Sequence, residues 1–242
     1  MKSSLLTGVH PVTEALRAGR PIERVLIARG AKQQRLQPVI EECRERGIPV
    51  RFEPREALDR LAHGAAHQGV IALAAEKEYA RLEDIVDALD HPGLLVALDG
   101  VEDPHNLGAV IRSAHAAGAD AVVVPQRRSA GLSETVGKAA AGALEHLPVI
   151  RTTNLNQEIE RLKQKRYWVY GFDERAEKNY DEVEYEGNVA LVLGGEGKGI
   201  HQLTAKHCDV LVKIPVVGRI ASLNVSVAAG IALFEVLRQR RK

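Results

Sequence analysis

The chain has 242 residues, 45% of them hydrophobic and 27% charged, with a formal net charge of +1. This composition is ordinary for a soluble globular protein, and the near-zero charge excludes a uniformly basic nucleic-acid coat. No apolar run reaches the roughly 18 residues of a membrane span, and the apolar start is too short for a signal peptide. Two distant cysteines, Cys43 and Cys208, without a CxxC pattern indicate a reducing compartment and no zinc site. We therefore expect a cytoplasmic protein without a metal.

The distribution of charge suggests three regions. Residues 1–75 carry 12 Lys and Arg against 8 Asp and Glu, residues 76–90 carry 2 against 6, and residues 91–242 are balanced at 19 against 18. A slightly basic front, an acidic connector and a neutral back half predict two domains, 1–75 and 91–242, joined by a linker at 76–90. The basic surplus of the front is only weak evidence for an RNA partner.

The front alternates helices and strands over about 75 residues, which is near the lower size limit for independent folding. Glycines at the ends of the helical patterns act as stop signals. The expected elements are a helix at 9–18, a strand at 25–28, a helix at 37–46, a strand at 50–52, a helix at 55–61 and a strand at 70–74.

The connector keeps helical spacing in part, and a second α/β series follows it. Several strands of this series are almost wholly apolar, which is typical of parallel strands that are buried on both faces. The expected strands are 94–98, 121–124, 149–150, 168–170, 189–193 and 210–214, and the expected helices are 107–117, 134–141, 155–165 and 224–240.

Three segments at the carboxyl ends of these strands carry the candidate chemistry, because ligands bind at that edge of open α/β sheets. The first is the polar loop and helix start of residues 99–112. Asn106 is well placed to cap the helix, and Arg112 follows about a turn and a half later. A capping Asn and a solvated Arg would be the purely structural alternative.

The second segment, residues 193–200, holds four glycines in six positions, so that backbone could approach a ligand closely. It fits neither the G-x-x-x-x-G-K-[ST] nor the G-x-G-x-x-G phosphate pattern. Because the carboxylate of Glu196 would repel a phosphate, we expect a neutral or cationic ligand, and the sulfonium of S-adenosylmethionine suits that requirement. A simple glycine-rich turn remains the alternative.

The third segment spans residues 214–226. Ser222 could cap the last helix, which is the structural explanation of its presence. Asn224 and Ser226 would then lie early in an apolar helix, where such side chains need a hydrogen-bond partner.

Together these segments closely resemble the SpoU family of RNA ribose 2′-O-methyltransferases. The three family motifs match Asn106, Gly108 and Arg112, then Gly194, Glu196 and Gly199, then Pro215, Ser222, Leu223, Asn224 and Ser226. Residues 8–12, 14–16 and 67–70 also resemble the family, so the resemblance covers nearly the whole chain. It is greatest to the branch that methylates a guanosine of large-subunit (23S) ribosomal RNA.

The resemblance implies an L30e-like substrate-binding domain in front and a trefoil-knotted α/β methyltransferase domain behind. The knot would involve residues 193–199 and 214–226. The resemblance further implies a homodimer with the active site near its interface, and S-adenosylmethionine as the cofactor. The expected cofactor contacts are Leu193, Gly194, Gly195, Ile214, Val216 and Leu223.

The expected catalytic residues are Arg112, Asn106, Glu196, Ser222 and Asn224. The family proposal makes the arginine a general base, but a guanidinium holds its proton tightly. We favour Arg112 as a stabiliser of the developing oxyanion that also contacts an RNA phosphate. Glu196 would orient Arg112 or the glycine-rich loop. In the front domain, Arg29, Lys32 and Arg35 are the candidates for RNA backbone binding.

Two alternatives stay open. The chain could be a non-catalytic RNA-binding module that kept the fold, although intact Arg112, Glu196 and Asn224 argue against that. It could also be a transfer-RNA methyltransferase of the same family. The resemblance of the front domain favours ribosomal RNA, but RNA recognition depends on the shape of unpaired regions and the residues cannot name the nucleotide.

Overall fold

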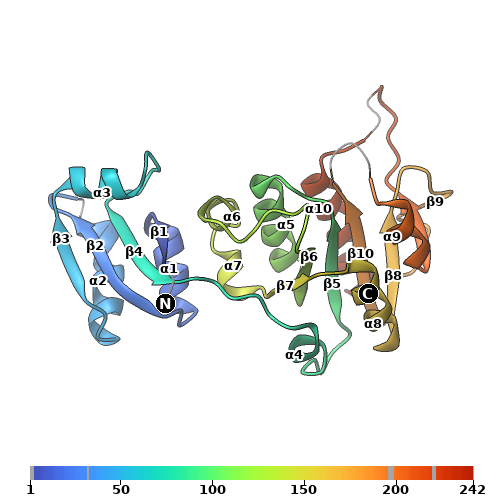
Figure 1. Ribbon diagram of the computed structural model, residues 1–242, viewed down its shortest axis with the longest axis horizontal. Helices are drawn as coiled ribbons and strands as arrows, with labels where there is room; N and C mark the ends of the chain where they lie inside the picture. The colour runs from blue at the N-terminus through green and yellow to red at the C-terminus, as the bar shows by residue number, and fades with distance from the viewer. Residues whose placement is uncertain (1–2, 32, 196–198, 220–221, 242) are drawn as a thin grey trace. The chain divides into compact units, whose positions relative to one another are not determined.

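A computed structural model describes residues 3–31, 33–195, 199–219 and 222–241 of the chain (Figure 1). The chain forms two compact units, Met1–Glu78 and Tyr79–Lys242. Each unit has hydrophobic clusters of its own. Both units alternate helices and strands, so the predicted α/β class is confirmed.

The first unit is a four-stranded sheet in the order β1-β4-β2-β3, with three helices. β1 and β2 pair with β4 in antiparallel fashion, whereas β2 and β3 are parallel. The strands are β1 (Ser3–Thr7), β2 (Ile22–Ala28), β3 (Val50–Glu53) and β4 (Val70–Ala75), and the helices are α1 (Val9–Arg17), α2 (Gln33–Glu45) and α3 (Arg55–Leu61).

Side chains alternate across this sheet, as the strand repeat requires. Val25 and Ile27 of β2 pack with the apolar side chains of α1 and α2. Leu26 and Ala28 point to the other face and pack with Leu58 of α3. The helices therefore cover both faces of the first sheet.

The second unit contains a seven-stranded sheet in the order β7-β6-β5-β10-β8-β11-β9, and the pairings found among its described residues are all parallel. Its strands are β5 (Leu94–Asp99), β6 (Ala121–Pro125), β7 (Val149–Thr152), β8 (Tyr167–Phe172), β9 (Lys178–Asn179), β10 (Asn188–Gly194) and β11 (Val210–Lys213). Its helices are α4 (Leu82–Val86), α5 (Pro104–Ala116), α6 (Glu134–Ala139), α7 (Ala143–His146), α8 (Leu155–Gln164), α9 (Gln202–His207) and α10 (Val225–Arg240).

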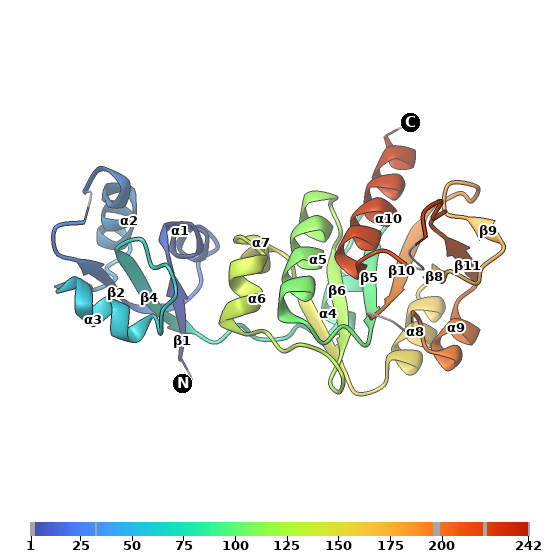
Figure 2. The ribbon, with the colours of Figure 1, turned by 90° about the horizontal axis from the view of Figure 1, so that it is seen from above.

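The central strands β5 and β10 are buried on both faces, which explains their continuous apolar sequences. Alternate residues such as Val96 and Leu191 pack with α5, α6, α7 and α10. Their neighbours, such as Ala97 and Val192, pack with α4, α8 and α9. Figure 2 shows α8 and α9 on the opposite side of the sheet from α10. This layering leaves the carboxyl ends of the strands free to carry loops.

Two helix starts differ from the sequence-based expectation. Asn106 does not cap α5, because the helix already begins at Pro104 and the Asp103 carboxylate accepts a hydrogen bond from the His105 N–H at 2.8 Å. Proline is favoured in the first helical turn and Asp is a strong cap, so the earlier start is the more stable one. Likewise α10 is capped by Asn224 and not by Ser222.

The expected linker at 76–90 is only partly a connector. Ala80 forms a parallel bridge with Ile150, and its N–H donates to the Val149 carbonyl at 2.9 Å. Leu82 is buried in the second unit. Apolar residues at helical spacing therefore bind residues 79–90 to the second unit in spite of their acidic neighbours. None of the helices within the described ranges combines the length and the apolar character that crossing a bilayer requires.

Candidate functional site

The parallel pairing of the second sheet brings the three candidate segments to one edge. Gly194 at the end of β10 lies opposite Asp99 at the end of β5. On its other side β10 pairs with β8, where Leu193 lies opposite Phe172. Residues that are about 100 positions apart in the sequence therefore meet at a single place on the sheet.

Backbone passes very close to backbone in the glycine-rich segment. A Cβ atom on Gly194 would lie 1.9 Å from the carbonyl carbon of Gly199, and one on Gly195 would lie 1.9 Å from the carbonyl oxygen of Gly100. Gly199 has a φ of +61°, a left-handed conformation that glycine adopts without strain. Gly194 and Gly195 are therefore required by the packing of the segments at this edge.

Asp99 forms hydrogen bonds both to Gly195, near the start of the glycine-rich segment, and to His201, directly after it. Its carbonyl accepts a hydrogen bond from the Gly195 N–H at 2.9 Å. Its buried carboxylate accepts a bond from the His201 N–H at 2.9 Å and lies 3.0 Å from His201 Nδ1. No role was predicted for Asp99, because its hydrogen bond joins residues that are 102 positions apart in the sequence.

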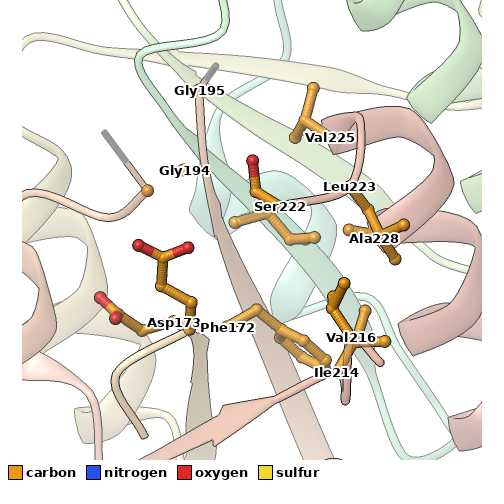
Figure 3. A pocket seen from close by; sticks show the side chains of 13 residues that line it. Phe172, Asp173, Gly194, Gly195, Ile214, Val216, Ser222, Leu223, Val225 and Ala228 are labelled. Atoms are coloured by element: carbon orange, nitrogen blue, oxygen red, sulfur yellow. The ribbon is translucent and has the colours of Figure 1, made fainter. Parts of the chain in front are cut away.

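A pocket of about 250 Å³ opens beside these loops, with lining residues from the ends of β8 and β10, from the segment after β11 and from the start of α10 (Figure 3). The six expected cofactor residues, Leu193, Gly194, Gly195, Ile214, Val216 and Leu223, all line it, as does Ser222. The further lining residues are Phe172, Asp173, Glu174, Gly199, Val225 and Ala228.

The pocket has an apolar side and an acidic side. Leu223, Val225 and Ala228 face Asp173 across it (Figure 3). Asp173 is buried, and the Arg175 guanidinium donates to its two oxygens at 2.8 and 2.6 Å. These side-chain hydrogen bonds are the main reason that the pKa of Asp173 is lowered, so the carboxylate is ionised at neutral pH.

Asp173 and Glu174 were not predicted to belong to the site. The available signal was their position directly after the strand that ends at Phe172, on the ligand-binding edge of the sheet. Charged residues after a strand are common, however, and only the pocket distinguishes these two.

Asn106 and Asn224 connect α5 to α10. Asn224 Nδ2 donates to Asn106 Oδ1 at 3.0 Å. Asn224 Oδ1 accepts from the Ser226 N–H at 2.9 Å and from the Ser226 hydroxyl at 2.6 Å. The polar residues that looked misplaced in an apolar helix therefore have partners, and they fix the start of α10 beside the pocket.

Arg112 lies apart from this network. It is exposed on α5, on the same helix face as His105, and does not line the pocket. Within the described ranges its guanidinium forms no ion pair or side-chain hydrogen bond. Glu196 and Lys32, two of the expected site residues, lie outside the residues that the structure describes.

In the first unit, the expected RNA-binding residues Arg29 and Arg35 are both exposed. Arg29 Nε donates to the Phe52 carbonyl at 3.3 Å, and the Phe52 ring is 49% exposed. No group of three or more His, Cys, Asp or Glu that could hold a metal occurs in the described parts of the chain.

Both halves of the chain match known families. Residues 93–234 match the SpoU rRNA Methylase family, and residues 5–80 match the family described as RNA 2′-O ribose methyltransferase substrate binding. The chain is 44% identical over 243 residues to the 23S rRNA (guanosine-2′-O-)-methyltransferase RlmB of Xylella fastidiosa, covering 99% of this chain and 98% of the relative. It is 43% identical, with the same coverage, to a Staphylococcus aureus protein named as a TrmH family tRNA/rRNA methyltransferase.

Solved structures of methyltransferases also superpose on this chain. The SpoU methyltransferase AviRb of Streptomyces viridochromogenes, in complex with AdoMet, superposes with a TM-score of 0.83 at 25% identity, covering 99% of this chain and 91% of that one. An AdoMet-bound rRNA methyltransferase of Sinorhizobium meliloti superposes with a TM-score of 0.81 at 28% identity, covering 98% and 87%. The chain belongs to the SpoU rRNA methylase family.

Proposed function

We propose that this protein transfers a methyl group from S-adenosylmethionine to the ribose 2′-hydroxyl of a guanosine in 23S ribosomal RNA, in the cytoplasm. The observation that carries the proposal is the pocket at the carboxyl edge of the second sheet, which is lined by residues of the second and third family motifs and is joined to the first motif by the bond between Asn224 and Asn106. The RlmB relative, 44% identical over its full length, supports the 23S guanosine. The Staphylococcus relative, whose name covers both tRNA and rRNA, keeps transfer RNA as the second candidate.

The chemistry of the pocket fits S-adenosylmethionine. The apolar side formed by Leu223, Val225 and Ala228 suits an adenine ring, and the glycine backbone allows the ligand to approach closely. The charge of Asp173 is balanced by Arg175, so the carboxylate of the neighbouring Glu174 is what gives the opposite side a negative charge, which suits a cation. When bound, S-adenosylmethionine supplies a methyl group on a positively charged sulfur that becomes neutral as the group departs.

The protein's contribution is alignment and charge stabilisation. The Asn106–Asn224 bond holds the start of α10, and with it Ser222 and Leu223, in a fixed position beside the pocket. Ser222 and Asn224 would bind the RNA through hydrogen bonds. Arg112 would stabilise the negative charge that develops on the ribose oxygen as its proton passes to solvent water and the oxygen bonds to the methyl carbon. Its guanidinium, which has no partner among the described residues, is available for that contact.

A homodimer would explain the exposed apolar side chains along one face of α10. Val227, Ile231 and Phe234 recur at helical spacing along one face of the helix. Val227 and Phe234 are each 50% exposed, although the opposite face of α10 is already buried against the sheet and α5. A helix that is apolar on all sides needs cover on all sides. A second copy of this chain on α10, close to the start of α10 at the pocket, would provide that cover.

We also propose that the chain is knotted around the pocket and that the first unit binds the RNA. The knot is supported by the close passage of Gly194 along Gly199 and by the return of the chain after β11 to the same pocket. RNA binding by the first unit is supported by its match to the substrate-binding family and by exposed Arg29 and Arg35. Lys32 lies outside the described residues and is included in this proposal because it lies between Arg29 and Arg35 in the sequence.

The test combines two measurements on Arg112→Ala and on the unaltered protein. We expect calorimetry to show the same affinity for S-adenosylmethionine in both, because Arg112 does not line the pocket. Transfer of radiolabelled methyl to a 23S ribosomal RNA transcript should fall by roughly 100-fold or more in the variant, since the developing charge loses its donor. Retained activity would remove Arg112 from the mechanism.

The substrate is tested separately with the unaltered protein. Transfer to the 23S transcript but not to bulk transfer RNA supports the proposal, and the reverse pattern supports the second candidate. RNA binding without transfer to either would leave only a non-catalytic RNA-binding protein.

A further inference from the structure

The loop between β6 and α6, residues 126–132, has the sequence Gln-Arg-Arg-Ser-Ala-Gly-Leu. Arg127 and Arg128 are both exposed, and the loop contains no carboxylate. We call these residues the arginine loop. Adjacent arginines on a surface are common, so the sequence of this loop does not by itself indicate a function.

Three hydrogen bonds hold the backbone of the arginine loop in place. The Gln126 N–H donates to the Thr152 carbonyl at 2.7 Å, and the Ala130 N–H donates to the Val101 carbonyl at 3.0 Å. The Leu132 N–H donates to the Tyr79 hydroxyl at 3.2 Å. The two arginines therefore project from a fixed backbone, so that a ligand binding to them has little loop entropy to overcome.

The backbone at Arg128 is unusual. Its φ is +56°, in the left-handed region that non-glycine residues adopt rarely and at a cost of about 1 kcal/mol or more. Other exposed arginines of this chain, such as Arg17 and Arg238, form ion pairs with a glutamate on their own helix. Arg127 and Arg128 form none within the described ranges, so their charges are free for an external anion.

A third cation lies on the neighbouring strand. Arg151 of β7 is exposed, and its guanidinium carbon lies 4.3 Å from the centre of the Tyr79 ring, whose hydroxyl holds the arginine loop. Tyr79 thus contacts both Arg151 and the backbone of the arginine loop. This arrangement places three positive charges on connected segments, a local grouping that the net charge of +1 does not reveal.

The arginine loop lies at the same edge of the sheet as the pocket. β6 pairs with β5 in parallel, so the loops that follow the two strands leave from the same side. The bond from Ala130 to Val101 joins the arginine loop to the loop that enters α5, the helix of Asn106 and Arg112. An RNA whose ribose reaches the pocket would have its neighbouring backbone within the reach of this loop.

We propose that Arg127 and Arg128 bind phosphates of the RNA that flank the target nucleotide. The inference rests on the proposed function, since it assumes that the RNA strand reaches the pocket. Arginine presents a planar fork of donors that matches a phosphate, and its charge is retained at any physiological pH. The catalytic unit would then hold the substrate backbone by itself, in addition to any contact made by the first unit.

The test is the salt dependence of RNA binding for the double variant Arg127→Gln/Arg128→Gln. Arg166→Gln is the matched control, because Arg166 is also exposed, also has a positive φ, of 63°, and also lacks an ion pair within the described ranges, but lies at the start of β8 on the opposite edge. Gln68 already adopts a φ of 53° in this protein, so glutamine is compatible with that backbone. Thermal melting of all variants checks that they are folded.

Filter binding of a radiolabelled 23S transcript between 50 and 200 mM salt supplies the readout. We expect the double variant to bind roughly tenfold more weakly at low salt and to lose about 1.5 from the slope of log K against log salt, which corresponds to two phosphate contacts. Arg166→Gln should match the unaltered protein, and the double substitution to lysine should restore most of the slope. An unchanged slope in the double glutamine variant, or an equal loss in Arg166→Gln, would overturn the proposal.

The same proteins separate this inference from the proposed function. Affinity for S-adenosylmethionine should be equal in all of them, because the arginine loop does not line the pocket. Failure of the unaltered protein to methylate the transcript would refute the proposed function even if the slopes differ as expected. Normal methylation with identical slopes would refute only the role of the arginine loop.

Discussion

At Gly194 and Gly199 two stretches of backbone lie closer together than any side chain would permit. The nearest atoms that a Cβ on Gly194 would meet belong to backbone, which cannot move aside as the end of a flexible side chain can. The sequence indicated that backbone must approach something closely here. The sequence could not show that the close neighbour of Gly194 is the backbone of Gly199. That contact depends on the path of the loop after β10, which no sequence pattern determines.

For Gly194→Ala we therefore expect a loss of cofactor affinity of at least tenfold, because the two segments must separate and the pocket changes shape. Calorimetry with S-adenosylmethionine measures it. Gly137→Ala is the control, since a Cβ there meets nothing within 4 Å and alanine favours the α6 helix by roughly 0.5 to 1 kcal/mol. Equal affinity in both variants would contradict the steric argument.

The Asp173–Arg175 pair makes stability depend on pH. The pKa of Asp173 is lowered in the folded protein, mainly by its hydrogen bonds to the Arg175 guanidinium. The pair therefore stabilises the fold above the ordinary carboxyl pKa of about 3.9 and loses this effect as the pH falls through the lowered pKa. Because Arg175 is exposed, solvent screens part of the interaction.

Arg175→Gln should accordingly melt at a lower temperature than the unaltered protein at pH 7. The backbone N–H of residue 175 still donates to Asp173 in the variant, so the comparison isolates the guanidinium. As the pH falls below about 4, the two melting curves should converge. A difference in melting temperature that grows as the pH falls would contradict the predicted direction of the effect.

At the scale of helices and strands, the elements with a clear hydrophobic pattern were predicted from the sequence. β5 and β10 are buried on both faces, and their unbroken apolar sequences indicated this. Short or edge elements such as β1, β9 and α9 were missed because two to six residues contain no repeat to detect. The start of α5 was misplaced by three residues, because Asp103 and Pro104 compete successfully with Asn106 as a start signal.

Asn224 links two elements, and its removal should have two separable effects. Asn224→Ala loses the cap of α10, which costs about 1 kcal/mol of unfolding free energy. It also loses the bond to Asn106, so methyl transfer should fall sharply. Asn154→Ala is the control, because Asn154 caps α8 at the Gln157 N–H without touching the pocket.

Denaturant unfolding should give a loss of stability for Asn224→Ala that is at least as large as that for Asn154→Ala, because Asn224 loses the bond to Asn106 as well as its cap, whereas only Asn224→Ala should lose turnover. If Asn154→Ala lost turnover equally, the effect would be one of general stability. The predicted roles of Ser222, Asn224 and Glu196 remain predictions until such comparisons are made.

At the scale of the whole molecule, the two units have separate cores. The pocket and the arginine loop both belong to the second unit. We therefore expect a fragment of residues 79–242 to bind S-adenosylmethionine with the affinity of the full chain but to bind a 23S transcript more weakly. Calorimetry and filter binding measure the two affinities. An unfolded fragment, or one with full RNA affinity, would show that this division of tasks is incorrect.

The walls of the pocket come from residues between Phe172 and Ala228, which all follow the first unit and β5 in the chain. During synthesis the first unit and the early strands of the second sheet therefore leave the ribosome before the walls of the pocket do. A nascent copy of this protein has no finished cavity for a methyl donor until Ala228 has emerged.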